Sequence, residues 1–138
     1  MKVRDIMSTN VEAASNQDSL SNVSSKMQSK NVGSVPVVEN GQVVGMITDR
    51  DIATRGLTNG TQGDNASQVM SQNVVTISPD ASAEEAAALM SQHQVRRLPV
   101  VENGNLVGML ALGDLAVQQK SDQSAGGALT QISENHTR

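Results

Sequence analysis

Hydrophobic residues along the chain follow a pattern that occurs twice. Residues 3–53 align with residues 66–116 at a constant offset of 63 residues, without a gap, and the hexapeptide PVVENG occurs at 36–41 and again at 99–104. Many aligned residues that differ exchange one aliphatic side chain for another, as Val35 does for Leu98. The pattern predicts a duplicated supersecondary unit. Two copies are too few for an open solenoid, so we expect them to pack face to face.

Each copy predicts the same order of elements. An extended stretch comes first, at residues 11–13 and 74–77, and a helix follows it. In the first copy, apolar residues between Leu20 and Met27 recur at helical spacing. In the second copy, Ser82 and Glu85 match a capping box that precedes an alanine-rich run.

A hairpin and a second helix complete each copy. Asn-Gly, at 40–41 and 103–104, is the strongest short signal for a two-residue type I′ turn, because both residues tolerate positive φ. Buried strands flank the turns, at 35–38 and 43–47 in the first copy and at 98–101 and 106–110 in the second. The second helix of the first copy is expected to end at Gly56.

We therefore predict an α/β (α+β) fold of two tandem β-α-β-β-α units related by a pseudo-twofold axis. The first unit spans residues 1–56 and the second spans residues 66–117. A polar, glycine-containing linker occupies 57–65, and residues 118–138 form a polar tail whose composition is typical of disordered segments.

Composition narrows the function classes. The formal net charge is −4 with no run of Lys or Arg, which argues against nucleic acid as a direct partner. The apolar runs are too short for a membrane span, and the N-terminus has no apolar secretion signal. The chain has no Cys, which excludes disulfides and thiolate chemistry and is compatible with a cytoplasmic location. It also has no aromatic residue, so a flat ligand would lie between aliphatic side chains.

Three stretches form a recognisable combination: the PVVENG hairpin, the segment GMITDRDIA at 45–53 with its Thr-x-x-Asp, and QVRRLPVV at 94–101. Together they resemble the CBS domain. The tandem pair, over residues 1–117, is similar to a Bateman module of a small stand-alone bacterial protein. The resemblance implies a homodimer and clefts between the units that bind an adenine nucleotide. The implied ligands are AMP, ADP, ATP or S-adenosylmethionine, and no cofactor is required.

Thr48 and Asp51 are the first candidate site residues, because they stand where a buried strand ends and a helix begins. The Thr48 hydroxyl would receive a phosphate, and the Asp51 carboxylate would accept hydrogen bonds from the ribose hydroxyls. Thr-x-x-Asp is also close to a capping box, so a purely structural role is the alternative.

The second copy departs from this pattern, because Ala111 replaces the threonine while Asp114 keeps the carboxylate. Asp114 could act as the N-cap of its own helix or contact a ribose. Arg96 and Arg97 precede the second copy's proline, where the first copy has Gly33 and Ser34. The resemblance implies that these arginines contact phosphate, reaching across to the cleft that holds Thr48 and Asp51. We therefore expect two unequal clefts, with the Thr48 cleft the stronger, although two solvated surface arginines are the alternative.

Aliphatic residues beside these positions are the candidates for contact with the base, and core packing is their alternative role. The main candidates are Val32, Val74, Ile77 and Val95, with Val11 and Ala13 as further candidates.

No nucleophile, general base or metal-ligand cluster forms a catalytic or metal site, so we expect no enzyme. The leading interpretation is a regulatory module that binds an adenine nucleotide and signals to a partner protein on another chain. The alternative is a ligand-free dimeric assembly protein that uses the same fold. A homodimer is expected because apolar helix residues would need cover if exposed, namely Ala86, Ala87, Met90 and Leu115.

Overall fold

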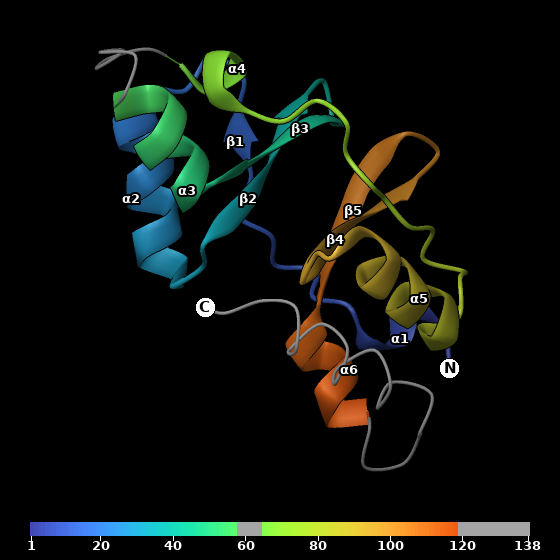
Figure 1. The fold of residues 1–138 in the computed structure, drawn as a ribbon. Coiled ribbons are helices and arrows are strands. Elements are labelled where there is room, and N and C mark those ends of the chain that lie inside the picture. Colours follow the sequence, from blue (N-terminus) through green and yellow to red (C-terminus); the bar gives the residue numbers. More distant parts are fainter. Residues whose placement is uncertain (58–64, 119–138) are drawn as a thin grey trace. The chain divides into compact units, whose positions relative to one another are not determined.

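The computed structural model describes residues 1–57 and 65–118, which fall into two compact units (Figure 1). Unit 1 comprises Met1–Val11 and the described chain from Val75 onward, and unit 2 comprises Glu12–Val74. Most of the predicted linker and nearly all of the predicted tail lie outside the described residues. The repeat boundaries predicted at 56, 66 and 117 stay a prediction.

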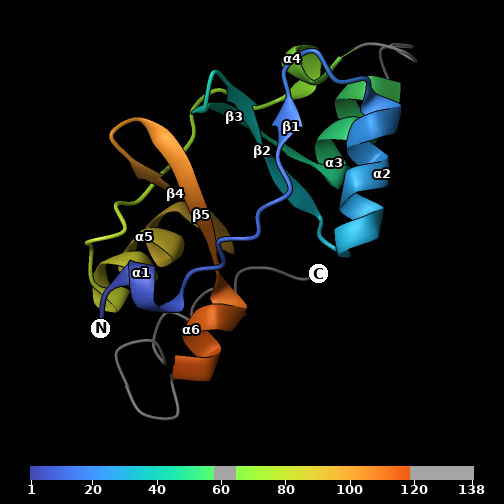
Figure 2. The same cartoon turned by 180° about the vertical axis from the view of Figure 1, so that it is seen from behind.

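Unit 2 is built on a small sheet in which β1 runs parallel to β2, and β2 runs antiparallel to β3. Helices α2 and α3 lie side by side near this sheet (Figures 1 and 2). The elements in chain order are β1 (Ala14–Ser15), α2 (Leu20–Lys30), β2 (Ser34–Glu39), β3 (Gln42–Thr48), α3 (Asp49–Asp51), a π-helix (Ile52–Leu57) and α4 (Ala66–Val69).

Unit 1 contains the hairpin of β4 and β5, and in place of a first strand it has one parallel bridge between Ile77 and Val100. Its core joins α1, α5 and α6 to this hairpin. The elements are α1 (Val3–Ile6), α5 (Ala83–His93), β4 (Arg97–Glu102), β5 (Asn105–Ala111) and α6 (Leu112–Gln118).

The predicted duplication is confirmed at the level of strand pairing. Val37 pairs with Ala14 on one side and Gly45 on the other, and Val100 pairs with Ile77 and Gly108, each partner shifted by the same offset. The Asn-Gly turns are confirmed as well. Their φ values are 53° and 81° in unit 2, and 54° and 84° in unit 1. The sequence signal therefore located both hairpins correctly.

Two predicted elements differ from the structure. The first strand lies at Ala14–Ser15 and not at 11–13, and its counterpart in the second copy shrinks to the Ile77 bridge. A turn follows directly, in which the Ala81 N–H donates to the Ser78 carbonyl, so pairing cannot continue along that segment. The second helix of the first copy has only three α-helical residues before it becomes a π-helix, which ends at Leu57.

The opening residues of each repeat pack against the body of the other repeat. In unit 1, the Val3 N–H donates to the Ala81 carbonyl at 2.8 Å, and Ser8 and Met109 exchange two backbone hydrogen bonds of 2.9 Å. In unit 2, Ser71 and Met46 exchange two such bonds, of 2.8 and 3.0 Å. Each compact unit is therefore assembled from both repeats.

Close backbone approach makes these contacts depend on glycine. A Cβ atom on Gly108 would lie 2.7 Å from Met7 Sδ and 2.8 Å from the Ser8 carbonyl oxygen. A Cβ atom on Gly45 would lie 2.5 Å from Met70 Sδ and 2.9 Å from the Ser71 carbonyl oxygen. Real Cβ atoms do not approach other atoms this closely, so only glycine lets the segment lie against the strand without a shift.

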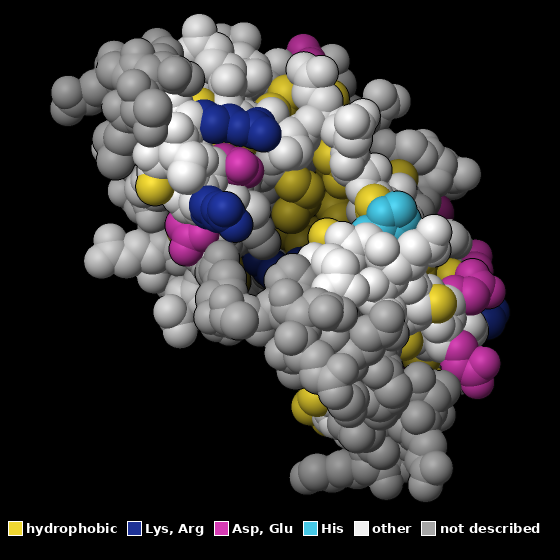
Figure 3. Space-filling model, in the orientation of Figure 1, with side chains coloured by type: hydrophobic (Ala, Val, Ile, Leu, Met, Phe, Trp, Pro, Cys, Tyr) yellow, Lys and Arg dark blue, Asp and Glu magenta, His cyan; other side chains and the backbone are white. Residues whose placement is uncertain are grey.

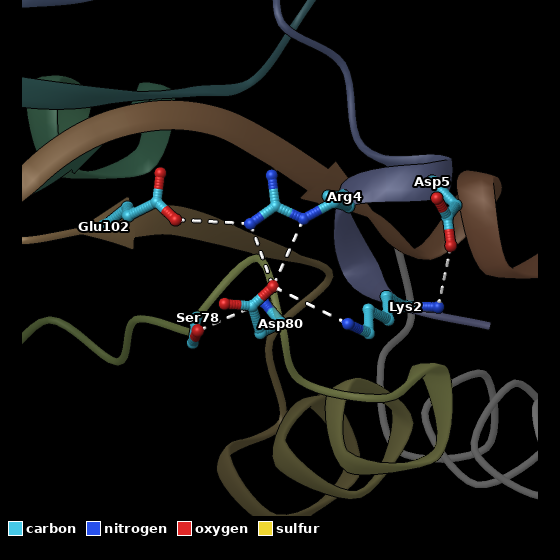
Figure 4. A network of polar contacts seen from close by, with 6 residues as sticks. All are labelled: Lys2, Arg4, Asp5, Ser78, Asp80 and Glu102. Atoms are coloured by element: carbon cyan, nitrogen blue, oxygen red, sulfur yellow. Dashed lines mark hydrogen bonds and ion pairs between the residues drawn. The ribbon is translucent and has the colours of Figure 1, made fainter.

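An ion-pair network holds α1 in unit 1 (Figure 4). The Arg4 guanidinium donates to Asp80 Oδ1 from Nε at 3.2 Å and from Nη2 at 2.9 Å, and Nη2 also donates to Glu102 Oε2 at 3.2 Å. The hydrogen bonds from Arg4 lower the pKa of the Asp80 carboxyl. All three side chains are solvent-exposed, so salt should screen the network.

The apolar helix residues that we expected at the surface are buried. Ala86, Met90 and Leu115 have no exposed surface and Ala87 is 3% exposed, because all four face the core of unit 1. The argument for a homodimer from these residues is therefore wrong. Dimerisation itself stays a prediction that rests on the family resemblance.

Candidate functional site

The first candidate site lies at a strand–helix corner of unit 2, which we call the unit 2 corner: Val32, Gly33, Ser34, Thr48 and Asp51. The hairpin register places Ser34 directly opposite Thr48. The Asp49 N–H donates to the Gly33 carbonyl at 2.9 Å. Two segments that are distant in the sequence, the stretch before Pro36 and the start of α3, therefore lie against each other.

Thr48 and Asp51 form the reciprocal capping box that the sequence suggested as one alternative. The Asp51 N–H donates to Thr48 Oγ1 at 3.0 Å, and the Thr48 N–H donates to Asp51 Oδ2 at 3.0 Å. Both side chains are half-buried. The cap is therefore confirmed, and it fixes the direction of the Asp51 carboxylate. A carboxylate has about four acceptor positions, so this bond does not exhaust its capacity to bind a ligand.

Unit 1 has the matching corner, which we call the unit 1 corner: Val95, Arg96, Arg97, Ala111 and Asp114. Arg97 lies opposite Ala111 in the hairpin, and the Leu112 N–H donates to the Arg96 carbonyl at 2.7 Å. The backbone arrangement is the same as in unit 2, with every residue shifted by the repeat offset.

Asp114 keeps half of the capping box. Helix α6 begins at Leu112, so Asp114 lies in the first turn of this helix. The sequence-based alternative in which Asp114 is the N-cap of the helix is therefore wrong. Its Oδ2 accepts a hydrogen bond from the Ala111 N–H at 2.7 Å, although Ala111 has no hydroxyl to return one. The two carboxylates are therefore held in the same way by a backbone N–H group.

The charges of the two corners differ. Arg97 is half-buried, which lowers the pKa of its guanidinium, and the negative charge of Asp114 opposes that shift. Arg96 beside it is exposed. The unit 2 corner has Gly33 and Ser34 at these positions and carries no arginine there.

The structure thus brings Arg97 near Asp114, within one unit, while Arg96 contributes its backbone carbonyl to the same corner. Counting outward from the Asn-Gly turn would place Arg97 opposite Leu110, but a one-residue register shift between Val100 and Val101 places it opposite Ala111. The expectation that Arg96 or Arg97 completes the site of Thr48 and Asp51 stays a prediction.

The aliphatic candidates for base contact fall into two groups. Val32 and Val95 are half-buried and follow the left-handed C-caps of α2 and α5, where each donates its N–H to a methionine carbonyl at 3.0 Å. Ile77 is only 5% exposed and belongs to the unit 1 core. Val74 is half-buried at the end of unit 2. Contact of any of them with a ligand stays a prediction, and core packing already accounts for Ile77.

Within residues 1–57 and 65–118, no group of three or more His, Asp or Glu side chains could hold a metal ion. No helix in the same ranges is long and apolar enough to cross a membrane. On the face shown in Figure 3, the described Lys and Arg side chains stand among acidic ones and form no continuous basic surface.

Comparison with known proteins explains why the corner occurs twice. A model of the CBS domain matches residues 3–57 and again residues 66–119. The chain belongs to the CBS domain family. The CBS domain-containing protein YhcV of Bacillus subtilis is 51% identical over 132 residues, which cover 95% of this chain and 94% of that protein.

Solved structures of CBS domain pairs share the fold. The CBS domain pair of protein MJ0100, in complex with 5′-methylthioadenosine and S-adenosyl-L-methionine, is 26% identical with a TM-score of 0.77, covering 87% of this chain and 96% of that one. CBSX2 in complex with AMP is 26% identical with a TM-score of 0.76, covering 86% of this chain and 98% of that one. The expected family and its α/β fold of tandem CBS domains are thereby confirmed.

Proposed function

We propose that this CBS domain pair is a regulatory module that binds an adenine nucleotide at its two corners and signals the bound state to a partner protein. The observation that carries the proposal is the repeated carboxylate. Asp51 and Asp114 occupy the same place in their units, and a backbone N–H group orients each one. An oriented carboxylate suits a vicinal diol such as that of ribose, since it accepts two hydrogen bonds at once.

Two further points support an adenine nucleotide as the ligand. Solved CBS domain pairs with the same fold hold AMP or S-adenosyl-L-methionine. Half-buried aliphatic residues flank each corner, namely Val32 in unit 2 and Val95 in unit 1. They offer apolar surface to a base in a chain that has no aromatic side chain for stacking. The proposal includes no catalytic step, and the homodimer, the cytoplasmic location and the target protein stay predictions.

The test is calorimetry with AMP, ADP, ATP and S-adenosylmethionine on the full chain and on the double variant D51N/D114N. Asparagine keeps an oxygen that can accept the capping hydrogen bond, but its second oxygen becomes an NH₂ donor. We expect the wild type to bind at least one of these ligands and the double variant to lose at least tenfold in affinity, since a hydrogen bond to a charged group contributes about 1.5–3 kcal/mol.

The control is E84A/E85A, which removes two exposed carboxylates from the first turn of α5 and changes the net charge equally. It should bind as the wild type does. If the wild type binds none of the four ligands, and none raises its melting temperature, the proposal is wrong and the ligand-free assembly protein becomes the better description.

A further inference from the structure

Methionine is the main oxidisable side chain of this protein. The chain has seven Met and no Cys, Trp or Tyr. A two-electron oxidant such as a peroxide therefore finds no thiol, and the methionine thioethers become its preferred targets. Their exposure decides which of the seven react first, because the oxidant must reach the sulfur atom.

The methionines fall into three classes of exposure. Three are buried, with at most 5% of their surface exposed, namely Met27, Met90 and Met109. Met1 is 60% exposed, so its side chain contributes little to packing. The remaining three are half-buried, namely Met7, Met46 and Met70. Half-buried methionines are the ones that are open in part to solvent and still pack against the protein.

Met7 and Met70 hold equivalent positions, where the opening segment of each repeat meets a strand. Met7 is the C-cap of α1 and Met70 is the C-cap of α4. The next residue, Ser8 or Ser71, exchanges two backbone hydrogen bonds with β5 or β3. Met7 packs against the core of unit 1, and Met70 packs against the core of unit 2. In each unit, one methionine side chain therefore connects the opening segment to the core.

Both sulfur atoms lie close to the backbone of a glycine. A Cβ atom on Gly108 would be 2.7 Å from Met7 Sδ, and one on Gly45 would be 2.5 Å from Met70 Sδ. An added atom does not fit between either sulfur and its glycine, so a sulfoxide oxygen must point elsewhere or push the segment off the strand. Oxidation also makes the apolar side chain polar, and packing it against a core then costs free energy unless the new oxygen finds a donor.

We propose that Met7 and Met70 are paired oxidation sites, through which a peroxide loosens the opening segment of each repeat from its unit. A lone pair of the thioether sulfur attacks one oxygen of hydrogen peroxide, and the O–O bond breaks. The other oxygen leaves as water, taking the proton of the transferred oxygen. The sulfur loses two electrons to the peroxide and becomes a sulfoxide. The proposal is independent of nucleotide binding, so its failure would leave the proposed function intact.

The test treats the full chain with hydrogen peroxide and measures the sulfoxide fraction at each methionine by peptide mass spectrometry. Thermal melts before and after treatment compare the wild type with M7L/M70L, since leucine has a similar volume and no sulfur. The matched control is M46L, which removes the third half-buried methionine, in β3. Amide hydrogen exchange of the wild type follows the opening segments directly.

We expect sulfoxide at Met7 and Met70 before it forms at the three buried methionines. Oxidation should lower the melting temperature of the wild type and of M46L by roughly 5–15 °C, and that of M7L/M70L by less than about 3 °C. The amides of Ser8 and Ser71 should exchange faster after treatment, because the bonds that protect them are loosened. Methionine sulfoxide reductases for both epimers should restore the melting temperature.

Two results would overturn the inference. The first is an equal fall in melting temperature for the wild type and M7L/M70L, which would assign the effect to other methionines. The second is oxidation of the buried methionines ahead of Met7 and Met70. If M7L/M70L did not fold, hydrogen exchange of the wild type would decide, since unchanged exchange at Ser8 and Ser71 after both sulfoxides have formed would contradict the proposal.

Discussion

Replacing Gly108 with alanine tests the packing of the N-terminal segment in unit 1. The new Cβ atom would lie 2.8 Å from the Ser8 carbonyl oxygen and 2.7 Å from Met7 Sδ. Backbone cannot move away as readily as the end of a flexible side chain, and Ser8 is held by two hydrogen bonds to Met109. Overpacking of this kind costs about 1–3 kcal/mol.

An opposing effect reduces the loss. The φ of Gly108 is not in the left-handed region, so alanine can adopt this backbone, and the less flexible unfolded chain contributes about 0.4–1 kcal/mol in favour of the variant. We expect a net loss of about 1–2 kcal/mol in the free energy of unfolding, which corresponds to a melting temperature lower by roughly 3–8 °C for a chain of this size.

The assay is urea denaturation, with G113A as the matched control. Gly113 lies in α6, and a Cβ atom there meets no atom within 4 Å. G113A should therefore stabilise the protein, by about 0.4–1 kcal/mol. A double-mutant cycle with M7A adds a second readout, since M7A should cost less in the G108A background because it removes one of the two clashes. If G108A were as stable as G113A, the close approach of Ser8 to β5 would be wrong.

Two further substitutions test the ion pairs and the turns. R4Q removes the hydrogen bonds that lower the pKa of Asp80, so the wild type should gain stability over R4Q above the usual pKa range of an aspartate. That gain should disappear as the pH falls through the folded-state pKa of Asp80 and at high salt; a gain that persists at low pH in thermal melts would contradict the ion-pair assignment. G104A places alanine at φ 84° and should destabilise the hairpin by about 1 kcal/mol, whereas G113A makes the same exchange at an exposed position of α6 whose φ is not in the left-handed region and should not destabilise. If G104A were as stable as G113A by denaturation, the turn would not be strained.

Local signals carried most of what the sequence predicted correctly. An Asn-Gly pair between aliphatic runs determines its own backbone, so both turns and the four hairpin strands were predicted within a few residues. The Thr48–Asp51 capping box was visible for the same reason, because all of its atoms lie within one turn of chain.

The sequence did not predict the features that depend on tertiary contacts, namely the burial of helix residues and the position of a short strand. The alanine-rich helix α5 has little contrast between its faces, so the sequence did not show that Ala86 and Ala87 are buried. A two-residue strand such as β1 exists only because β2 lies beside it, which explains its displaced prediction. The position of Arg97 opposite Ala111 was also not predictable from the turn, because it depends on a register shift between Val100 and Val101.

The local sequence of the segment before residue 11 does not determine which unit it packs against, because the residues that make its contacts occur in both repeats. Met7 and Ser8 match Met70 and Ser71, and each methionine lies over a glycine in its own unit. A single repeat thus contains both a segment and a surface that are complementary to their counterparts in the other repeat, and their assignment emerges only from three-dimensional packing.

This exchange of segments sets the order in which the protein can fold during synthesis. Unit 2 is continuous in the chain, so its contacts become available as soon as residues 65–74 have left the ribosome. Unit 1 must join its opening segment to residues that are made much later, because Arg4 and Glu102 are separated by 98 positions. At a synthesis rate of about 5–20 residues per second, the N-terminal segment remains without its final partner for roughly 5–20 seconds. During that interval its apolar residues, Val3, Ile6 and Met7, lack the core that buries them in the folded unit, which exposes them to aggregation or to a chaperone.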